Sequence, residues 1–258
     1  MKNSFEGVED IRSFTNVRAI EAYRATRLNG ANLRAQWLAE QSALTHPFAV
    51  VEVGAGSSCL LYSFAESGIL SHGIGIEPTH SRYEFAEHWR RAIGYENVEN
   101  LCATFQEVPV RRAAVDMVLI LDNTLSYMCS GNEGNLQITV TLAFQWLRVR
   151  GMLVIEVADY ARKPNWERHV ETQSDSRFSA SSHRIELLSN DEVLSESMVF
   201  PRIGDPIKRR DGARCIRKEH LEGLLLEIGF EDIRITTEAI PWVNQEGYPH
   251  YILTAVRP

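Results

Sequence analysis

The chain has 258 residues, which is enough for one domain with an appendage or for two modest domains. Its 44% hydrophobic and 24% charged residues are the ordinary balance of a globular protein, and no apolar run is long enough to cross a bilayer. This composition excludes a membrane-embedded or disordered chain, and the formal net charge of −7 argues against a nucleic-acid partner.

The N-terminal residues lack the basic start and the apolar stretch of a secretory signal. The four cysteines, Cys59, Cys102, Cys129 and Cys215, lie far apart and do not have the spacing of metal ligands. We therefore expect a cytoplasmic protein with free thiols and no metal site.

Between residues 17 and 41, apolar side chains recur at roughly helical spacing, with an interruption at Asn29 and Gly30. This pattern predicts two short helices that are joined at the interruption.

Residues 48–160 alternate between short apolar runs and segments of helical character. The runs typical of strands are 48–54, 72–78, 98–105, 115–122 and 151–160, and the segments typical of helices are 58–68, 81–94 and 134–149. The alternation predicts a Rossmann-like α/β fold with a doubly wound, mostly parallel sheet.

After Tyr160 the chain becomes polar, and residues 183–202 then alternate in short β-like stretches with turn residues between them. This segment predicts an antiparallel β insertion over residues 161–214. A helix is expected at 216–230, and strands at 231–239 and 248–256 bring the main sheet to seven strands.

A glycine turn follows the first predicted strand, with Glu52 two residues before Gly54 and with Gly56 next in the pattern. Glycines permit a tight turn and a close approach of a ligand to the backbone. A dinucleotide site would have a third glycine where this chain has Cys59, and a carboxylate at Glu52 would repel a pyrophosphate. The turn therefore favours a ligand with a cationic group, although a structural turn without a ligand is the alternative.

The second predicted strand ends in another acidic residue, Glu77. A carboxylate at this place can accept hydrogen bonds from both hydroxyls of a ribose. The alternative, a solvated carboxylate at a strand end, is weakened by the glycine turn one β/α unit earlier.

Glu52, Gly54, Gly56 and Glu77, in this order at consecutive strand ends, resemble the cofactor-binding pattern of class I S-adenosylmethionine-dependent methyltransferases. The segment LDNTLSYM is similar to the reaction-centre segment of glycine N-methyltransferase and of amino-sugar N,N-dimethyltransferases, with Tyr127 where those families have a histidine. Thr104 stands where the family commonly has a carboxylate that contacts adenine. The resemblance assigns these residues to S-adenosyl-L-methionine: Glu52, Gly54, Ala55, Gly56, Glu77, Pro78, Thr104, Phe105, Asp122, Asn123 and Tyr23.

The resemblance further implies three functional parts. Residues 1–45 are expected to form an N-terminal helical lid, residues 46–160 and 215–258 the cofactor-binding domain, and residues 161–214 an insertion that covers the substrate. An arginine from Arg24, Arg27 and Arg34 is expected to pair with the cofactor carboxylate, with solvated arginines as the alternative.

The candidate catalytic residues are Tyr127, which would orient the nucleophile, and His183 and Asp122, which would receive its proton; His169 ranks behind them. We expect a methyltransferase that acts on a small molecule, most readily on nitrogen. The alternatives are an O-methyltransferase, a nucleotide-dependent oxidoreductase and a non-catalytic methyltransferase-like binding protein. The sequence does not identify the acceptor, and it leaves a homodimer open.

Overall fold

The computed structural model describes Glu9, Ile11 and residues 16–42, 47–171, 178–188, 190–201, 205–237 and 248–258. The elements in chain order are α1 (Val17–Gln41), β1 (Phe48–Val53), α2 (Cys59–Glu66), β2 (Leu70–Ile76), α3 (His80–Ile93), β3 (Val98–Leu101), β4 (Val115–Ile120), α4 (Thr124–Met128), α5 (Gly134–Trp146), β5 (Leu147–Ala158), β6 (Asn165–Glu171), β7 (Phe178–Leu187), β8 (Glu192–Pro201), β9 (Ile207–Arg214), α6 (Lys218–Ile228), β10 (Glu231–Thr236) and β11 (His250–Val256).

The main sheet has seven strands in the order β10-β11-β5-β4-β1-β2-β3. β11 is antiparallel to both of its neighbours, and the other adjacent pairs are parallel. The predicted Rossmann-like, mostly parallel seven-stranded sheet is therefore confirmed. The strand order reverses direction between β1 and β4, and ligands of such sheets bind beyond the carboxyl ends of the strands at this switch point.

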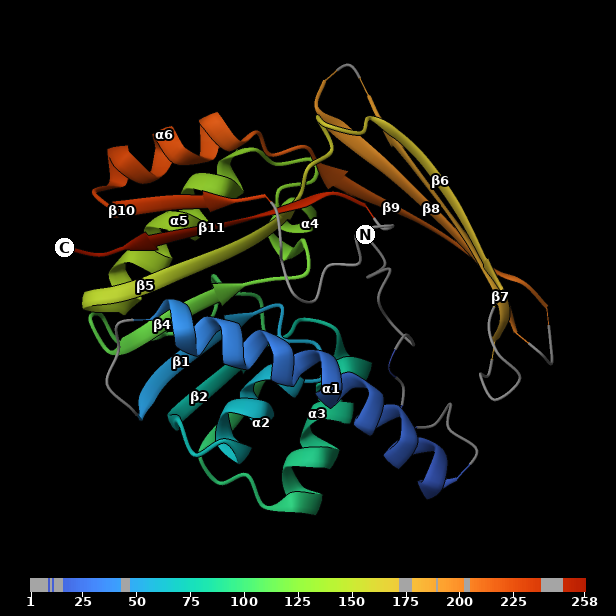
Figure 1. Ribbon diagram of the computed structural model, residues 1–258, viewed down its shortest axis with the longest axis horizontal. Coiled ribbons are helices and arrows are strands. Elements are labelled where there is room, and N and C mark those ends of the chain that lie inside the picture. Colours follow the sequence, from blue (N-terminus) through green and yellow to red (C-terminus); the bar gives the residue numbers. More distant parts are fainter. Residues whose placement is uncertain are drawn as a thin grey trace.

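Helices cover both faces of this sheet (Figure 1). One face carries α1, α2 and α3, where Leu38, Leu61 and Phe85 belong to a buried cluster with the strand residues Val50 and Met117. The other face carries α5 and α6, which pack over a second cluster. All six residues of β4 are buried, as expected for a central strand that is covered on both faces. No helix in the described part of the chain is long and apolar enough to span a membrane.

The predicted break in the N-terminal helix is wrong, because α1 runs through Asn29 and Gly30 as one helix of 25 residues. A glycine inside a helix costs only about 1 kcal/mol relative to alanine. Ala31, Ala35 and Leu38 bury one side of α1 against the main sheet and α2, and this packing outweighs the cost.

The predicted boundary between the helix at 134–149 and the next strand is also corrected. α5 ends at Trp146, and the following residues, Leu147 to Val149, belong to β5. Leu147 pairs with Val115 of β4, so sheet pairing replaces the helical hydrogen bonds at this point.

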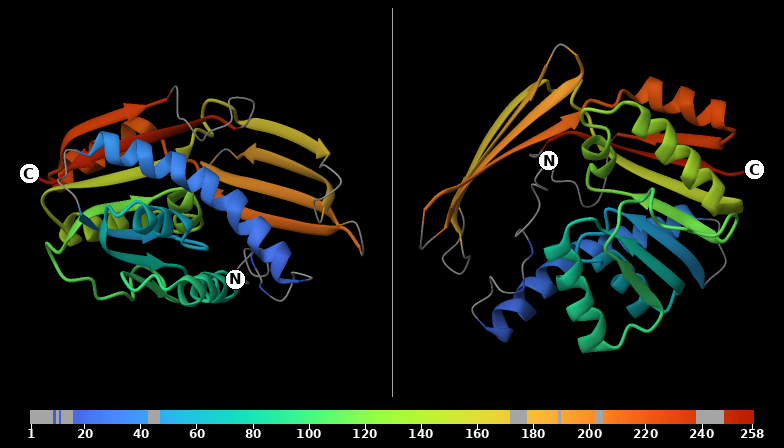
Figure 2. Two further views of the ribbon diagram at one scale, coloured as in Figure 1. Left: turned by 60° about the horizontal axis from the view of Figure 1, so that its bottom comes forward. Right: turned by 180° about the vertical axis from the view of Figure 1, so that it is seen from behind.

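A separate antiparallel sheet is formed by β6, β7, β8 and β9 in that order. It projects from the end of the molecule where β4 and β5 end (Figures 1 and 2). We call the seven-stranded sheet and the helices that cover it the main domain. One face of the four-stranded sheet packs against the main domain through a buried cluster that contains Tyr160, Ile185, Val193 and Ala213, with Tyr127 packed against it. The predicted antiparallel insertion is confirmed, and its strands are longer than the short stretches expected.

Candidate functional site

The glycine turn after β1 is fixed against the ends of two neighbouring strands. The backbone N–H groups of Gly54 and Ala55 donate to the carbonyl oxygen of Ile76, at 2.8 and 3.0 Å. Gly54 has φ of +71°, and a Cβ at this residue would lie 2.5 Å from side-chain atoms of Thr124. Both the backbone conformation and the close approach to Thr124 therefore require glycine.

Glu77 directs its carboxylate back at the same turn. Its Oε2 accepts from the N–H of Gly56 at 2.9 Å and from Arg82 at 3.4 Å, and its Oε1 accepts from the N–H of Thr79 at 2.8 Å. The residue is only 4% exposed. Glu77 is thus held at the carboxyl end of β2, next to the glycine turn.

Glu52 lies on β1 with its carboxylate buried, and within the described residues its Oε2 has no hydrogen-bond partner. Burial raises the pKa of Glu52 to about 8, and the nearby negative charge of Asp122 adds to the rise. The positive charges of three nearby arginines lower the pKa of Glu52 but do not cancel the rise: Arg34, Arg82 and Arg27. A buried carboxylate that lacks a partner is costly, and it is a feature of sites that await a cationic group.

Asp122 follows β4 and forms a bidentate ion pair with Arg34 of α1. Nη1 of Arg34 lies 2.8 Å from Oδ2, and Nη2 lies 2.5 Å from Oδ1. Nearby protein atoms would raise the pKa of Asp122, but Arg34 outweighs this effect and holds the pKa at about 2. The side chain is nevertheless 55% exposed, so it lines a space that solvent can enter. Because its pKa is so low, Asp122 is a weak base at neutral pH.

Backbone strain marks the loop that contains Asp122. Asp122 and Asn123 have φ of +51° and +61°, a conformation that is rare for residues other than glycine. Such strain persists only where neighbouring contacts enforce it, and it concentrates at functional sites. Asn123 supplies such contacts, because its side-chain amide donates to the hydroxyl of Tyr160 at 2.6 Å and accepts from the N–H of Ala158 at 3.0 Å.

A second buried carboxylate, Glu156 of β5, lies beneath this loop. Its Oε2 accepts from the N–H of Asp122 at 3.4 Å, and its Oε1 lies 3.0 Å from Nδ1 of His250 on β11. Glu52, Asp122 and Glu156 thus form an acidic group around Arg34 at the ends of the central strands.

Tyr127 extends from α4 toward the four-stranded sheet and packs against the cluster that joins the two sheets. Burial raises its pKa, and the negative charge of Asp211 adds to the rise. The hydroxyl therefore stays protonated at neutral pH and is suited to donate a hydrogen bond rather than to act as a base.

His183 lies on β7, where its Nε2 is 2.8 Å from the hydroxyl of Ser195 on β8 and its ring meets Trp166 edge to face. Burial lowers its pKa, so the imidazole is neutral at neutral pH and can accept a proton. His169 is exposed and lies on β6, three residues from Trp166, so its side chain is on the opposite face of the sheet.

Three further residues assigned to the cofactor lie after β2 and β3: Pro78, and the two predicted adenine contacts Thr104 and Phe105. The hydroxyl of Thr104 donates to Glu107 at 2.8 Å, on the exposed surface, while Phe105 is buried in the core. Pro78 is exposed beside Glu77. The structure therefore brings Pro78 to the site edge, whereas Thr104 already has a side-chain partner.

The N-terminal segment contributes a carboxylate that the sequence did not single out. Glu9 is 1% exposed and accepts from the hydroxyl of Tyr23 at 2.7 Å and from Nε of Arg82 at 2.8 Å, with Arg27 at 3.5 Å. Although burial raises its pKa, Arg82 and Arg27 hold the pKa of Glu9 below its usual value. Arg24 lies elsewhere, paired with Glu66 at 3.2 Å.

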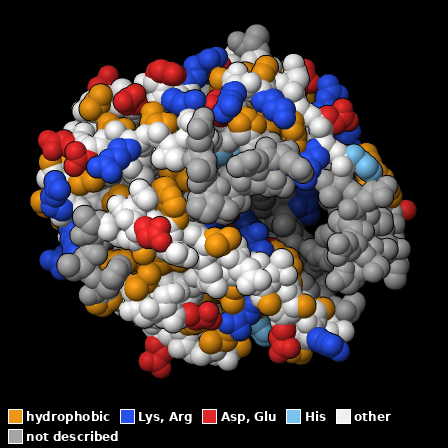
Figure 3. Space-filling model, in the orientation of Figure 1, with side chains coloured by type: hydrophobic (Ala, Val, Ile, Leu, Met, Phe, Trp, Pro, Cys, Tyr) orange, Lys and Arg blue, Asp and Glu red, His pale blue; other side chains and the backbone are white. Residues whose placement is uncertain are grey.

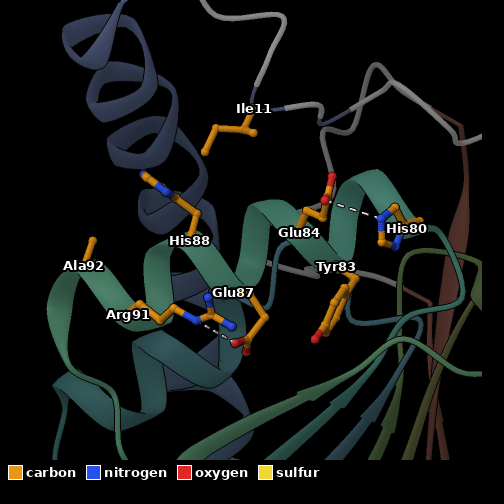
Figure 4. Close-up of a pocket in the computed structure, with 8 residues that line it drawn as sticks. All are labelled: Ile11, His80, Tyr83, Glu84, Glu87, His88, Arg91 and Ala92. Atoms are coloured by element: carbon orange, nitrogen blue, oxygen red, sulfur yellow. Dashed lines mark ion pairs between the residues drawn. The ribbon is translucent and has the colours of Figure 1, made fainter.

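Two hollows are visible on the surface. One, of about 720 Å³, runs along α3 between the pairs His80–Glu84 and Arg91–Glu87, and none of the candidate residues lines it (Figure 4). The other opens between the main domain and the four-stranded sheet, and Lys and Arg side chains are visible at its wall (Figure 3). The first hollow is therefore not formed by the candidate residues.

No family model and no curated protein matches this sequence, but solved structures match its fold. The CcbJ methyltransferase from Streptomyces caelestis is 13% identical with a TM-score of 0.70, over 87% of this chain and 88% of that chain. A S-adenosylmethionine-bound amino pentose methyltransferase of calicheamicin biosynthesis from Micromonospora echinaspora is 15% identical with a TM-score of 0.68, over 95% and 98%. A sugar N-methyltransferase from Streptoalloteichus sp. is 15% identical with a TM-score of 0.62, over 91% and 87%. The chain therefore has the fold of S-adenosylmethionine-dependent methyltransferases.

Proposed function

We propose that the protein transfers a methyl group from S-adenosylmethionine to a nitrogen atom of a small molecule. The observation that carries the proposal is the placement of Glu52 and Glu77, at the ends of adjacent parallel strands, on either side of one glycine turn. The turn lies at the switch point of the sheet, where this class of fold binds ligands.

The chemistry of these residues fits the cofactor. Oε2 of Glu52 is buried without a partner, and a cationic ammonium group of a methionyl chain would satisfy it. A carboxylate has about four acceptor positions, so Glu77 retains capacity for a ribose hydroxyl besides its three present donors. Arg27 or Arg34, two arginines of α1 that lie near the site, would pair with the cofactor carboxylate.

When bound, S-adenosylmethionine supplies an electrophilic methyl group on a sulfonium. The protein has then to align the acceptor nitrogen with that methyl group, and alignment alone lowers a barrier by about 7 to 11 kcal/mol. Tyr127 lies between the Asp122 loop and the four-stranded sheet, where its protonated hydroxyl can orient the acceptor. The neutral imidazole of His183 is the group proposed to receive the proton from the nitrogen.

The choice of nitrogen rests on the structural relatives, two of which are described as acting on an amino pentose or as a sugar N-methyltransferase. In the proposal, the acceptor binds in the hollow between the main domain and the four-stranded sheet (Figure 3). In the proposal, residues 1–45 act as a lid and residues 161–214 cover the acceptor. The four free cysteines favour the cytoplasm as its compartment.

Calorimetric titration of the purified protein with S-adenosylhomocysteine and, in parallel, with NAD tests the proposal. Binding of S-adenosylhomocysteine together with no binding of NAD is expected. Binding of NAD instead would favour the oxidoreductase, and binding without turnover on any amine or alcohol would favour a non-catalytic protein.

A further inference from the structure

Asp211, on β9, belongs to a row of polar side chains on the face of the small sheet that meets the main domain. Strand pairing places Asp211 directly opposite Ser195, whose hydroxyl lies 2.8 Å from Nε2 of His183 on β7. Side chains of directly opposed residues lie on the same face of an antiparallel sheet, about 5 Å apart at Cβ. His183, Ser195 and Asp211 therefore line one stripe across three strands.

The same face is turned toward the proposed reaction centre. Ala213, two residues beyond Asp211 on β9, is fully buried in the cluster against which Tyr127 packs. Residues two apart in a strand point to the same side. Asp211 on the small sheet and Tyr127 on α4 thus face each other. The negative charges of Asp211 and of Asp122, at the end of β4, both act on the Tyr127 hydroxyl and raise its pKa.

Asp211 carries an unsatisfied acceptor. Its Oδ1 is buried, and nothing in the described ranges of the chain hydrogen-bonds to it. Leaving a buried polar atom without a partner costs roughly 1 to 3 kcal/mol, and more when the group is charged. Since Ser195 and His183 are bonded to each other, they do not relieve this cost. A group that does so has to come from outside these residues.

We infer that Asp211 binds the amino group of the acceptor, in its ammonium form, and thereby selects amines over alcohols. The inference rests on the proposed function and names the acceptor class more closely: a small molecule with a basic primary or secondary amine. An ammonium satisfies a carboxylate with both charge and hydrogen bonds, whereas an alcohol in the same place leaves the charge of Asp211 uncompensated. Asp211 is a binding residue here and adds no covalent step. The bound ammonium passes one proton to His183, and the lone pair of the resulting amine then attacks the methyl group.

The test uses the full chain with S-adenosylmethionine and a panel of primary amino sugars, each paired with the sugar that has a hydroxyl in place of the amine. Formation of S-adenosylhomocysteine is measured for the wild type, for Asp211→Asn, for Asp211→Glu and for a matched control, Asp205→Asn, whose residue is exposed. The wild type and the control are expected to use amines at least tenfold better than the paired alcohols.

Asp211→Asn should raise KM for the best amine at least tenfold while the Kd for S-adenosylhomocysteine stays within twofold. Asp211→Glu keeps the charge and should retain the preference for amines. It therefore separates the loss of the charge from a folding defect caused by substitution at this position. Equal KM values for wild type and Asp211→Asn, with methylated amine formed by both, would overturn the inference alone. Preference for alcohols, no methylated amine despite binding of S-adenosylhomocysteine, or failure to bind S-adenosylhomocysteine would instead overturn the proposed function.

Discussion

Arg34 of α1 donates hydrogen bonds from both of its terminal nitrogens to the carboxylate of Asp122, which lies 88 positions later in the chain. The pair links the N-terminal helix to the loop after β4, so the helix and the strained loop hold each other in place. Both residues lie near Glu52. The negative charge of Asp122 raises the pKa of Glu52, and the positive charge of Arg34 lowers it.

Arg34→Lys should therefore weaken binding of S-adenosylhomocysteine by roughly tenfold, because lysine keeps the charge but cannot form two parallel hydrogen bonds. The same substitution at Arg24, which pairs with Glu66 away from the site, is the matched control and should leave the affinity unchanged. Calorimetry on both variants gives the comparison. If Arg24→Lys and Arg34→Lys have the same affinity, the link between α1 and the proposed cofactor site has no role in binding.

Glu77→Ala should weaken binding of S-adenosylhomocysteine at least about tenfold, since losing one hydrogen bond to a charged acceptor costs about 1.5 to 3 kcal/mol. Glu99→Ala, at an exposed position of β3, is the control. Isothermal titration calorimetry measures the affinity of both variants for S-adenosylhomocysteine. An unchanged affinity in Glu77→Ala would remove Glu77 from the site.

Glu52 should make the stability of the unliganded protein depend on pH. Its pKa rises from 4.5 to about 8 on folding, so the folded state holds more protons in this range and becomes less stable as the pH rises through it. Glu52→Gln lacks this titration, and its Tm should exceed that of the wild type by a margin that grows from about pH 4.5 to about pH 8. A constant margin across this range, measured by thermal unfolding, would contradict the buried, unpaired carboxylate.

Tyr127→Phe should lower kcat by about tenfold or more and leave the Kd for S-adenosylhomocysteine almost unchanged, because the role proposed for the hydroxyl is to orient the acceptor and not to bind the cofactor. Tyr83→Phe, on α3 in the hollow of Figure 4, is the control for the loss of a tyrosine hydroxyl. Steady-state kinetics with the best amine of the panel measures both. Equal turnover in Tyr127→Phe and the wild type would leave Tyr127 without a role in orienting the acceptor.

The fold and part of the site follow from local sequence patterns. The alternation of apolar runs and helical segments, together with Glu52, Gly54 and Glu77 at strand ends, is local information, and parallel strands bring their carboxyl ends to one edge. The break expected at Gly30 was wrong because helix stability depends on the packing of Ala31, Ala35 and Leu38, which a single segment does not reveal.

The remaining site residues depend on tertiary contacts. Glu9 reaches Arg82 across 73 positions, and Glu156 meets His250 across 94. Asp211 stands in a charged stretch with no pattern that separates it from its neighbours, and only the pairing of β8 with β9 places it opposite Ser195. Arg82 had a local signal, since it lies on the helix that begins just after Glu77.

A crystal structure of the protein with S-adenosylhomocysteine would show whether Glu52 and Glu77 bind this ligand. We expect its amino group to lie within hydrogen-bonding distance of Glu52 and a ribose hydroxyl to lie within hydrogen-bonding distance of Glu77. A ligand bound away from the glycine turn, or crystals grown at saturating concentration that contain none, would contradict this expectation.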